Sequence, residues 1–196
     1  KVVQTRAVEF ANKYKVPVRV LSSFNDGSGT LISLKDESME NALVSGIAFQ
    51  KDQVKFTLHS VGDIPGTAFK ILGPISDAEI EVDVIVQNVS IDDKTDFTFT
   101  VSNEDSDSVK KILEDLKTEV DYKKLIINSD IAKVSLVGTG MRSQAGVASK
   151  AFRALSENNV NIQIISTSEI KITMVIDESL IDKAVNVLHE EFELEK

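Results

Sequence analysis

The sequence lacks cysteine and tryptophan, and its 196 residues include only three prolines and two tyrosines. Without cysteine the chain can form neither disulfide bonds nor thiolate metal sites, which is typical of cytoplasmic proteins. Its hydrophobic runs are far shorter than the roughly 18 apolar residues expected of a membrane span. Residues 1–14 are polar, unlike a signal peptide. We therefore expect a cytoplasmic protein without a membrane-spanning helix.

Basic residues are also scarce, with 22 Lys and Arg against 31 Asp and Glu and a net charge of −9. Nucleic-acid binding requires a concentrated basic surface, and these basic residues are scattered, so we expect no nucleic-acid partner. The two histidines, His59 and His189, lie on different expected elements without ligand-like spacing to acids. The sequence therefore predicts no metal site.

Motifs of nucleotide-dependent and hydrolytic enzymes are missing as well. The sequence has neither a Walker loop nor a G-x-S-x-G elbow. Gly138 and Gly140 resemble part of a dinucleotide-binding loop, but the third glycine of that motif is not at the required spacing. We expect no catalytic residue in this chain.

The most informative feature present is a diverged internal repeat. The stretch beginning VKFTLHSVGDIPGTAFKILG at Val54 matches VSLVGTGMRSQAGVASKAFR at Val134. At an offset of 80 residues, Gly66 aligns with Gly146. The offset then falls because IDDKTD at 91–96 has no counterpart in the second copy, as expected of an insertion at a hairpin tip.

Both copies predict the same order of elements. A short strand and a Gly-containing loop precede a helix with apolar residues at i, i+3, i+4 and i+7. Two alternating strands follow, centred on residues 80–86 and 97–101 in the first copy and on 160–164 and 170–176 in the second. A second helix and a last short strand, at 125–127 and near 192–194, complete each copy. The order βαββαβ predicts an α+β protein with two ferredoxin-like domains.

Other segments depart from the repeat. Gly73-Pro74 lies inside the first helix of copy one, where proline predicts a kink or an early end. Before the repeats, residues 5–15 predict a helix, 16–24 a strand and 30–33 a short strand. We expect residues 1–41 to be the end of another domain and a linker, 51–127 the first repeat domain and 128–196 the second. Residues 42–50 predict a further strand that joins the second domain.

One loop could hold a small molecule with both charges of an amino acid. HSVGDIPGTA places Pro65 and Gly66 at the start of a helix, where free N–H groups favour a carboxylate. Asp63, just before them, could pair with an ammonium group, or it could simply cap the helix. The equivalent loop, GTGMRSQAG, has the uncharged Ser143 instead, so the two loops should differ in function.

Three long motifs resemble the tandem ACT domains of bacterial aspartate kinase. They are VDVIVQNVS, AKVSLVGTGMRSQAGVASKAFRAL and NVNIQIISTSEIKITMVI, while VPVRVLSSFNDGSGTLIS resembles the end of that family's amino-acid-kinase domain. The resemblance implies two ferredoxin-like ACT domains preceded by a short remnant of the kinase domain. It also implies either a separate regulatory subunit or a C-terminal piece of the enzyme, without catalytic activity of its own.

The resemblance further implies that lysine, threonine or both bind between ACT domains and feedback-inhibit the ATP-dependent phosphorylation of L-aspartate. It implies no cofactor in this chain, since ATP and Mg would be used by the missing kinase domain. The partners implied are that catalytic domain or subunit and a second copy of the chain. A structural assembly subunit without a functional effector site is the alternative. The effector-binding residues implied are Asp63, Pro65, Gly66, Ala68, Gln87, Asn88, Asn159, Asn161, Ile162 and Ser168, with Met141, Arg142 and Ser143 in the second loop.

Overall fold

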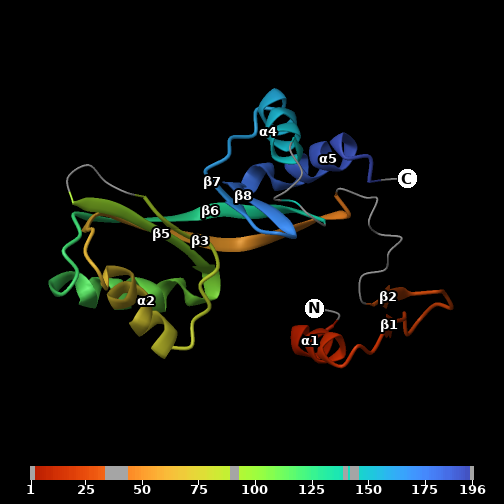
Figure 1. Cartoon of the computed structure of the whole chain (residues 1–196), viewed down its shortest axis with the longest axis horizontal. Helices are drawn as coiled ribbons and strands as arrows, with labels where there is room; N and C mark the ends of the chain where they lie inside the picture. Colours follow the sequence, from red (N-terminus) through yellow and green to blue (C-terminus); the bar gives the residue numbers. More distant parts are fainter. Residues whose placement is uncertain (1–2, 34–43, 89–92, 139–140, 142–145, 195–196) are drawn as a thin grey trace. The chain divides into compact units, whose positions relative to one another are not determined.

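The computed structural model describes residues 3–33, 44–88, 93–138, 141 and 146–194 (Figure 1). The chain divides into two compact units, Lys1–Ala42 and Leu43–Lys196. In the first unit, helix α1 (Thr5–Lys13) precedes two antiparallel strands, β1 (Val18–Val20) and β2 (Thr30–Ile32). The predicted helix and both strands are present, although β1 is shorter than predicted. Gly29, with φ +63°, starts the return strand, and a Cβ there would lie 2.2 Å from the carbonyl oxygen of Val20.

The second unit is built on one antiparallel sheet of six strands, in the order β4-β5-β3-β6-β8-β7. The strands are β3 (Gly46–Gly62), β4 (Ile85–Gln87), β5 (Lys94–Ser102), β6 (Lys124–Val137), β7 (Ile164–Thr167) and β8 (Lys171–Asp177). The helices are α2 (Thr67–Asp77), α3 (Ser106–Asp115), α4 (Val147–Glu157) and α5 (Ile181–Glu191), with 3₁₀ turns at Asn103–Asp105, Leu116–Thr118 and Glu178–Leu180. The two copies of βαββαβ thus share a single sheet, as the ferredoxin-like prediction requires.

The two central strands are long because each serves both repeats. Residues 53–62 of β3 pair with β5 and with 124–131 of β6, whereas residues 46–50 pair with 133–137 of β6. The register shifts on either side of Gln53, where the strands pass from one repeat to the other. Residues 46–50 therefore lie beside the first strand of the second repeat.

Each repeat has its own hydrophobic core, and the two cores lie on opposite faces of the sheet. Figure 1 shows α2 against one face and α4 and α5 against the other. On β6, Leu125 packs in the first core while Val134 and Leu136 pack in the second, as expected of odd and even positions along a strand. The largest fully buried side chains are Phe56, Phe97, Phe99, Leu58, Ile71, Ile75, Leu113, Ile131, Leu136, Leu155, Ile172 and Met174.

The predicted last strand near 192–194 is wrong. Phe192, Glu193 and Leu194 form a turn after α5. The place beside β6 that this strand would take in a ferredoxin-like unit is already occupied by residues 46–50 of β3. The missing strand of the second repeat is therefore supplied from before the first.

Two further expectations need correction. Helix α2 does not end at Gly73-Pro74 but continues to Asp77, with Ile71 and Ile75 on either side of the proline fully buried. A single lost backbone hydrogen bond is evidently offset by this packing. The second strand of each repeat is also shorter than its alternating pattern. Residues 80–84 and 160–163 lie outside β4 and β7, although their apolar side chains, such as Val84 and Val160, are buried.

Candidate functional site

The loop between β3 and α2 is held in a fixed shape by its backbone. Gly66 is the N-cap of α2 with φ +94°, a left-handed conformation that favours glycine. The Thr67 hydroxyl donates to the carbonyl oxygen of Gly62 at 2.9 Å, closing the loop at its base. Pro65 lies in the turn before the helix, and Ala68 lies in the first helical turn. The first N–H groups of a helix lack intrahelical partners, so this turn can receive an anion.

Asp63 and Gln87 are brought together although 24 residues separate them. The Nε2 of Gln87, the last residue of β4, donates to Oδ1 of Asp63 at 3.1 Å, and both residues are exposed. No side chain caps α2, so the alternative in which Asp63 serves as the helix cap does not hold. The exposed carboxylate of Asp63 therefore lies free of the helix, with a neutral amide beside it, in a position to accept an ammonium group.

Asn88 anchors the same region through its backbone. Its carbonyl oxygen accepts a hydrogen bond from the Thr95 hydroxyl, which joins the end of β4 to β5. The backbone N–H of Asp63 donates to the carbonyl oxygen of Asp93 at 2.8 Å. These contacts fix the end of β4 and the loop after β3 on the same side of the first repeat.

The equivalent loop of the second repeat is only partly described. Gly146 is the N-cap of α4 with φ +103°, repeating the conformation of Gly66. Met141 is buried, and its N–H donates to the carbonyl oxygen of Glu169 at 3.0 Å. Arg142 and Ser143 lie outside the described residues. Ser168 is engaged in the turn between β7 and β8, where its N–H donates to the carbonyl oxygen of Lys171 and its Oγ accepts from the N–H of Lys171.

Asn159, Asn161 and Ile162 lie between α4 and β7, on the second repeat. Asn159 and Asn161 are exposed, and Ile162 packs against the second core. Asn159 has φ +56°, like Glu79 (φ +58°) at the equivalent position of the first repeat. β7 and β4 are the two edge strands of the six-stranded sheet, roughly 24 Å apart at about 4.8 Å per strand. One chain therefore does not bring Asn161 and Ile162 to Asp63 and Gln87.

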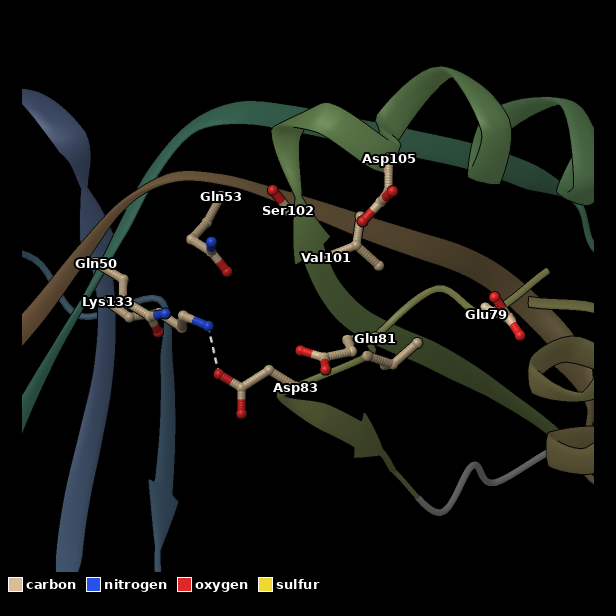
Figure 2. A pocket seen from close by; sticks show the side chains of 10 residues that line it. Gln50, Gln53, Glu79, Glu81, Asp83, Val101, Ser102, Asp105 and Lys133 are labelled. Atoms are coloured by element: carbon tan, nitrogen blue, oxygen red, sulfur yellow. Dashed lines mark hydrogen bonds and ion pairs between the residues drawn. The ribbon is translucent and has the colours of Figure 1, made fainter. Parts of the chain in front are cut away.

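A polar cavity of about 600 Å³ lies where the two repeats meet, and sequence reasoning missed it (Figure 2). Its walls include the carboxylates of Glu79, Glu81, Asp83 and Asp105 and the side chain of Lys133. Lys133 is only 3% exposed, and its ammonium group pairs with Asp83. The only sequence signal is that Lys133 alternates with the apolar residues of its strand, which places it on the face opposite the core of the second repeat.

The described residues contain no group of three or more His, Asp or Glu that could hold a metal ion. His59 is instead bound through Nδ1 to the carboxylate of Asp96 at 2.7 Å. No helix in the described part of the chain is long and apolar enough to cross a membrane.

Comparison with known proteins agrees with this architecture. Two family models described as ACT domain match residues 58–121 and 134–192. An aspartate kinase of Pseudomonas fluorescens is 56% identical over 196 residues, which are 100% of this chain and 48% of that protein. The chain thus spans about half the length of this curated relative.

Among solved structures, one of aspartokinase alpha and beta subunits is 46% identical, with a TM-score of 0.72, over 77% of this chain and 99% of the other. The ligand-free regulatory subunit of aspartate kinase from Thermus thermophilus is 32% identical, with a TM-score of 0.73, over 76% and 99% of the two chains. Escherichia coli aspartokinase III, solved with lysine and aspartate, shares the fold at 23% identity and a TM-score of 0.75, over 98% of this chain and 42% of that chain. The chain therefore belongs to the aspartate kinase family and corresponds to its regulatory region, with two ACT domains.

Proposed function

We propose that this chain binds an end-product amino acid, lysine or threonine or both, and thereby feedback-inhibits an aspartate kinase. The pairing of Asp63 with Gln87 beside the Gly66 helix start carries the proposal. An α-amino acid presents an ammonium group to Asp63 and a carboxylate to the first turn of α2. The lysine-bound structure of the related aspartokinase III supports an amino acid as the effector.

The effector site is completed by a second copy of the chain. Asn159, Asn161 and Ile162 lie at the opposite edge of the sheet from Asp63 and cannot reach it within one chain. Both edge strands carry exposed apolar side chains, Ile85 (48% exposed) and Ile165 (45%), which a dimer would cover. We therefore propose a homodimer in which Asn161 and Ile162 of one copy close the pocket around Asp63 and Gln87 of the other.

The catalytic partner is the aspartate kinase domain, either on the same polypeptide or on a separate subunit. The P. fluorescens enzyme matches all of this chain, whereas the regulatory subunit of T. thermophilus covers 76% of it. This difference supports residues 1–41 as the end of the kinase domain. ATP and Mg would be bound by that domain, which transfers the γ-phosphate to the β-carboxylate of aspartate. We place the complex in the cytoplasm, where ATP and aspartate are available.

Inhibition follows from linkage between effector binding and domain arrangement. An effector that contacts residues from two ACT domains binds the arrangement in which they are close more tightly than any other, and so raises its population. A coupling free energy of about 1–3 kcal/mol changes the affinity of the linked site by about 5- to 150-fold. The kinase responds because the arrangement favoured by the effector is the less active one.

Calorimetric titration of the full chain with lysine and threonine, separately and together, tests the proposal. We expect heat of binding from at least one of them, and loss of that heat in Asp63→Ala. Asp121→Ala is the matched control, since Asp121 is an exposed acid of the same repeat that pairs with Lys94. If neither amino acid binds at millimolar concentration, the chain is a structural assembly subunit and the proposal is wrong. Unchanged affinity in Asp63→Ala would show that the ammonium partner is another residue.

A further inference from the structure

Two lysines of the central strands contact the opposite repeat in matching ways. Lys133, at the start of the first strand of the second repeat, pairs with Asp83 of the first repeat. Lys55, on the first strand of the first repeat, donates from Nζ to Oε1 of Gln163 of the second at 2.5 Å. Asp83 and Gln163 are equivalent positions, because they are 80 residues apart, the offset of the repeat. The two contacts are thus related by the internal symmetry of the unit.

The opposite placement of the two cores explains this crosswise pattern. Lys55 alternates with the core residues Val54 and Phe56, and Lys133 alternates with Ala132 and Val134. Each lysine therefore leaves its strand on the face opposite its own core, which is the face covered by the helices of the other repeat. There it meets the segment that connects the first helix of the other repeat to its edge strand. Figure 2 shows Lys133 pointing across the cavity to Asp83 in this way.

Both segments lead directly to residues of the candidate site. Asp83 precedes Gln87 by four residues, and Gln163 precedes Ser168 by five. The segment at Asp83 has little regular pairing, because β4 begins only at Ile85. It is attached to β5 through Thr100, whose carbonyl oxygen accepts from the N–H of Asp83 at 3.1 Å. The Lys133 pair is therefore a substantial part of what fixes this segment.

We propose that the pairs Lys133–Asp83 and Lys55–Gln163 form a reciprocal latch, in which each repeat positions the edge strand of the other. Lys133 and Lys55 are positioning residues that act on the effector site through Asp83 and Gln163. Lys133 contributes more, because its partner is a carboxylate and its side chain is 4% exposed, whereas Lys55 meets a neutral amide. A change at one repeat's edge strand thereby reaches the central strand of the other. The effect on effector binding rests on the proposed function, while the positioning of the strands does not.

Hydrogen exchange of the full chain tests the latch directly. In Lys133→Met we expect amide exchange in β4, in the other repeat, to be about tenfold faster. In Lys55→Met we expect about threefold faster exchange in β7. Lys51→Met is the matched control, because Lys51 also lies on a central strand and pairs with Asp182 at 3.3 Å, but in an exposed pair. It should change neither strand.

Additional variants separate positioning from general destabilisation. Lys133→Arg should restore β4 exchange to within about twofold of the original, since arginine keeps the charge and the hydrogen-bond donors. Asp83→Asn should accelerate β4 exchange as Lys133→Met does, and the double variant should add nothing further. Asp83→Asn also serves if Lys133→Met does not fold. Faster exchange confined to the lysine's own repeat, or equal acceleration throughout the sheet, would overturn the latch.

Effector affinity gives the second readout. Lys133→Met should weaken binding of lysine or threonine by about three- to tenfold, although Lys133 does not contact the Asp63 site. If the unaltered chain binds neither amino acid, the proposed function fails, while the exchange experiment still decides the latch. If the unaltered chain binds and the crosswise exchange pattern is missing, the latch alone fails.

Discussion

Replacing Gly66 by alanine should disturb the candidate site through backbone conformation alone. Gly66 has φ +94°, and no atom lies within 4 Å of the position that a Cβ would take. The substitution therefore creates no clash, and its cost comes from forcing an L-residue into the left-handed region, about 1–2 kcal/mol. Alanine also restricts the unfolded chain, which returns about 0.4–1 kcal/mol. The net loss of unfolding free energy should be about 0.5–1 kcal/mol.

Gly146 provides the control for this prediction. It is the N-cap of α4 with φ +103° and an equally open Cβ position, so Gly146→Ala should cost about the same stability. Only Gly66→Ala should also weaken amino-acid binding at Asp63, because only that glycine precedes the helix of the candidate site. Urea unfolding measures the first quantity and calorimetry the second. The reasoning is refuted if Gly66→Ala stabilises the chain, or if Gly146→Ala weakens binding equally.

Three further predictions concern stability. Phe56→Ala removes a fully buried ring from the first core and should lower the unfolding free energy by about 3–5 kcal/mol, measured by urea unfolding; a loss below 1 kcal/mol would contradict the assigned core. Tyr122→Phe removes a hydrogen bond of 3.0 Å from the hydroxyl to the carbonyl oxygen of Leu113 and should cost about 1 kcal/mol in the same assay. Hydrogen bonds from the hydroxyl and the N–H of Ser179 lower the pKa of Asp177, so its stabilising contribution is present above the unfolded-state pKa and is lost as the pH falls below about 4. Asp177→Asn should remove that part of the acid dependence of the urea midpoint, and an unchanged pH profile would contradict the assignment.

The repeat made much of the fold predictable from the sequence. Local periodicity identified the helices, and the offset of 80 residues matched Gly66 with Gly146, which share one unusual backbone conformation. The pairing of Asp63 with Gln87 also followed from the order of elements, since the loop after the first strand and the end of the second lie near each other in a βαββαβ unit.

Long-range exchange between the repeats could not be predicted in the same way. The expected strand near 192–194 has an apolar pattern, but its place beside β6 is occupied by residues 46–50, which come from before the first repeat. Strand pairing of that kind depends on competition between distant segments, which local pattern does not record. The contact of Lys133 with Asp83 was missed for the same reason, because no motif links two residues 50 positions apart.

The central claim is that an amino acid binds at Asp63 in a pocket completed by a second copy of the chain. A crystal structure of the full chain grown with lysine and threonine tests it most directly. We predict an amino acid whose ammonium nitrogen lies about 3 Å from the carboxylate of Asp63, with Asn161 and Ile162 of the second copy against its side chain. An amino acid bound entirely within one chain, or bound away from Asp63, would contradict the account.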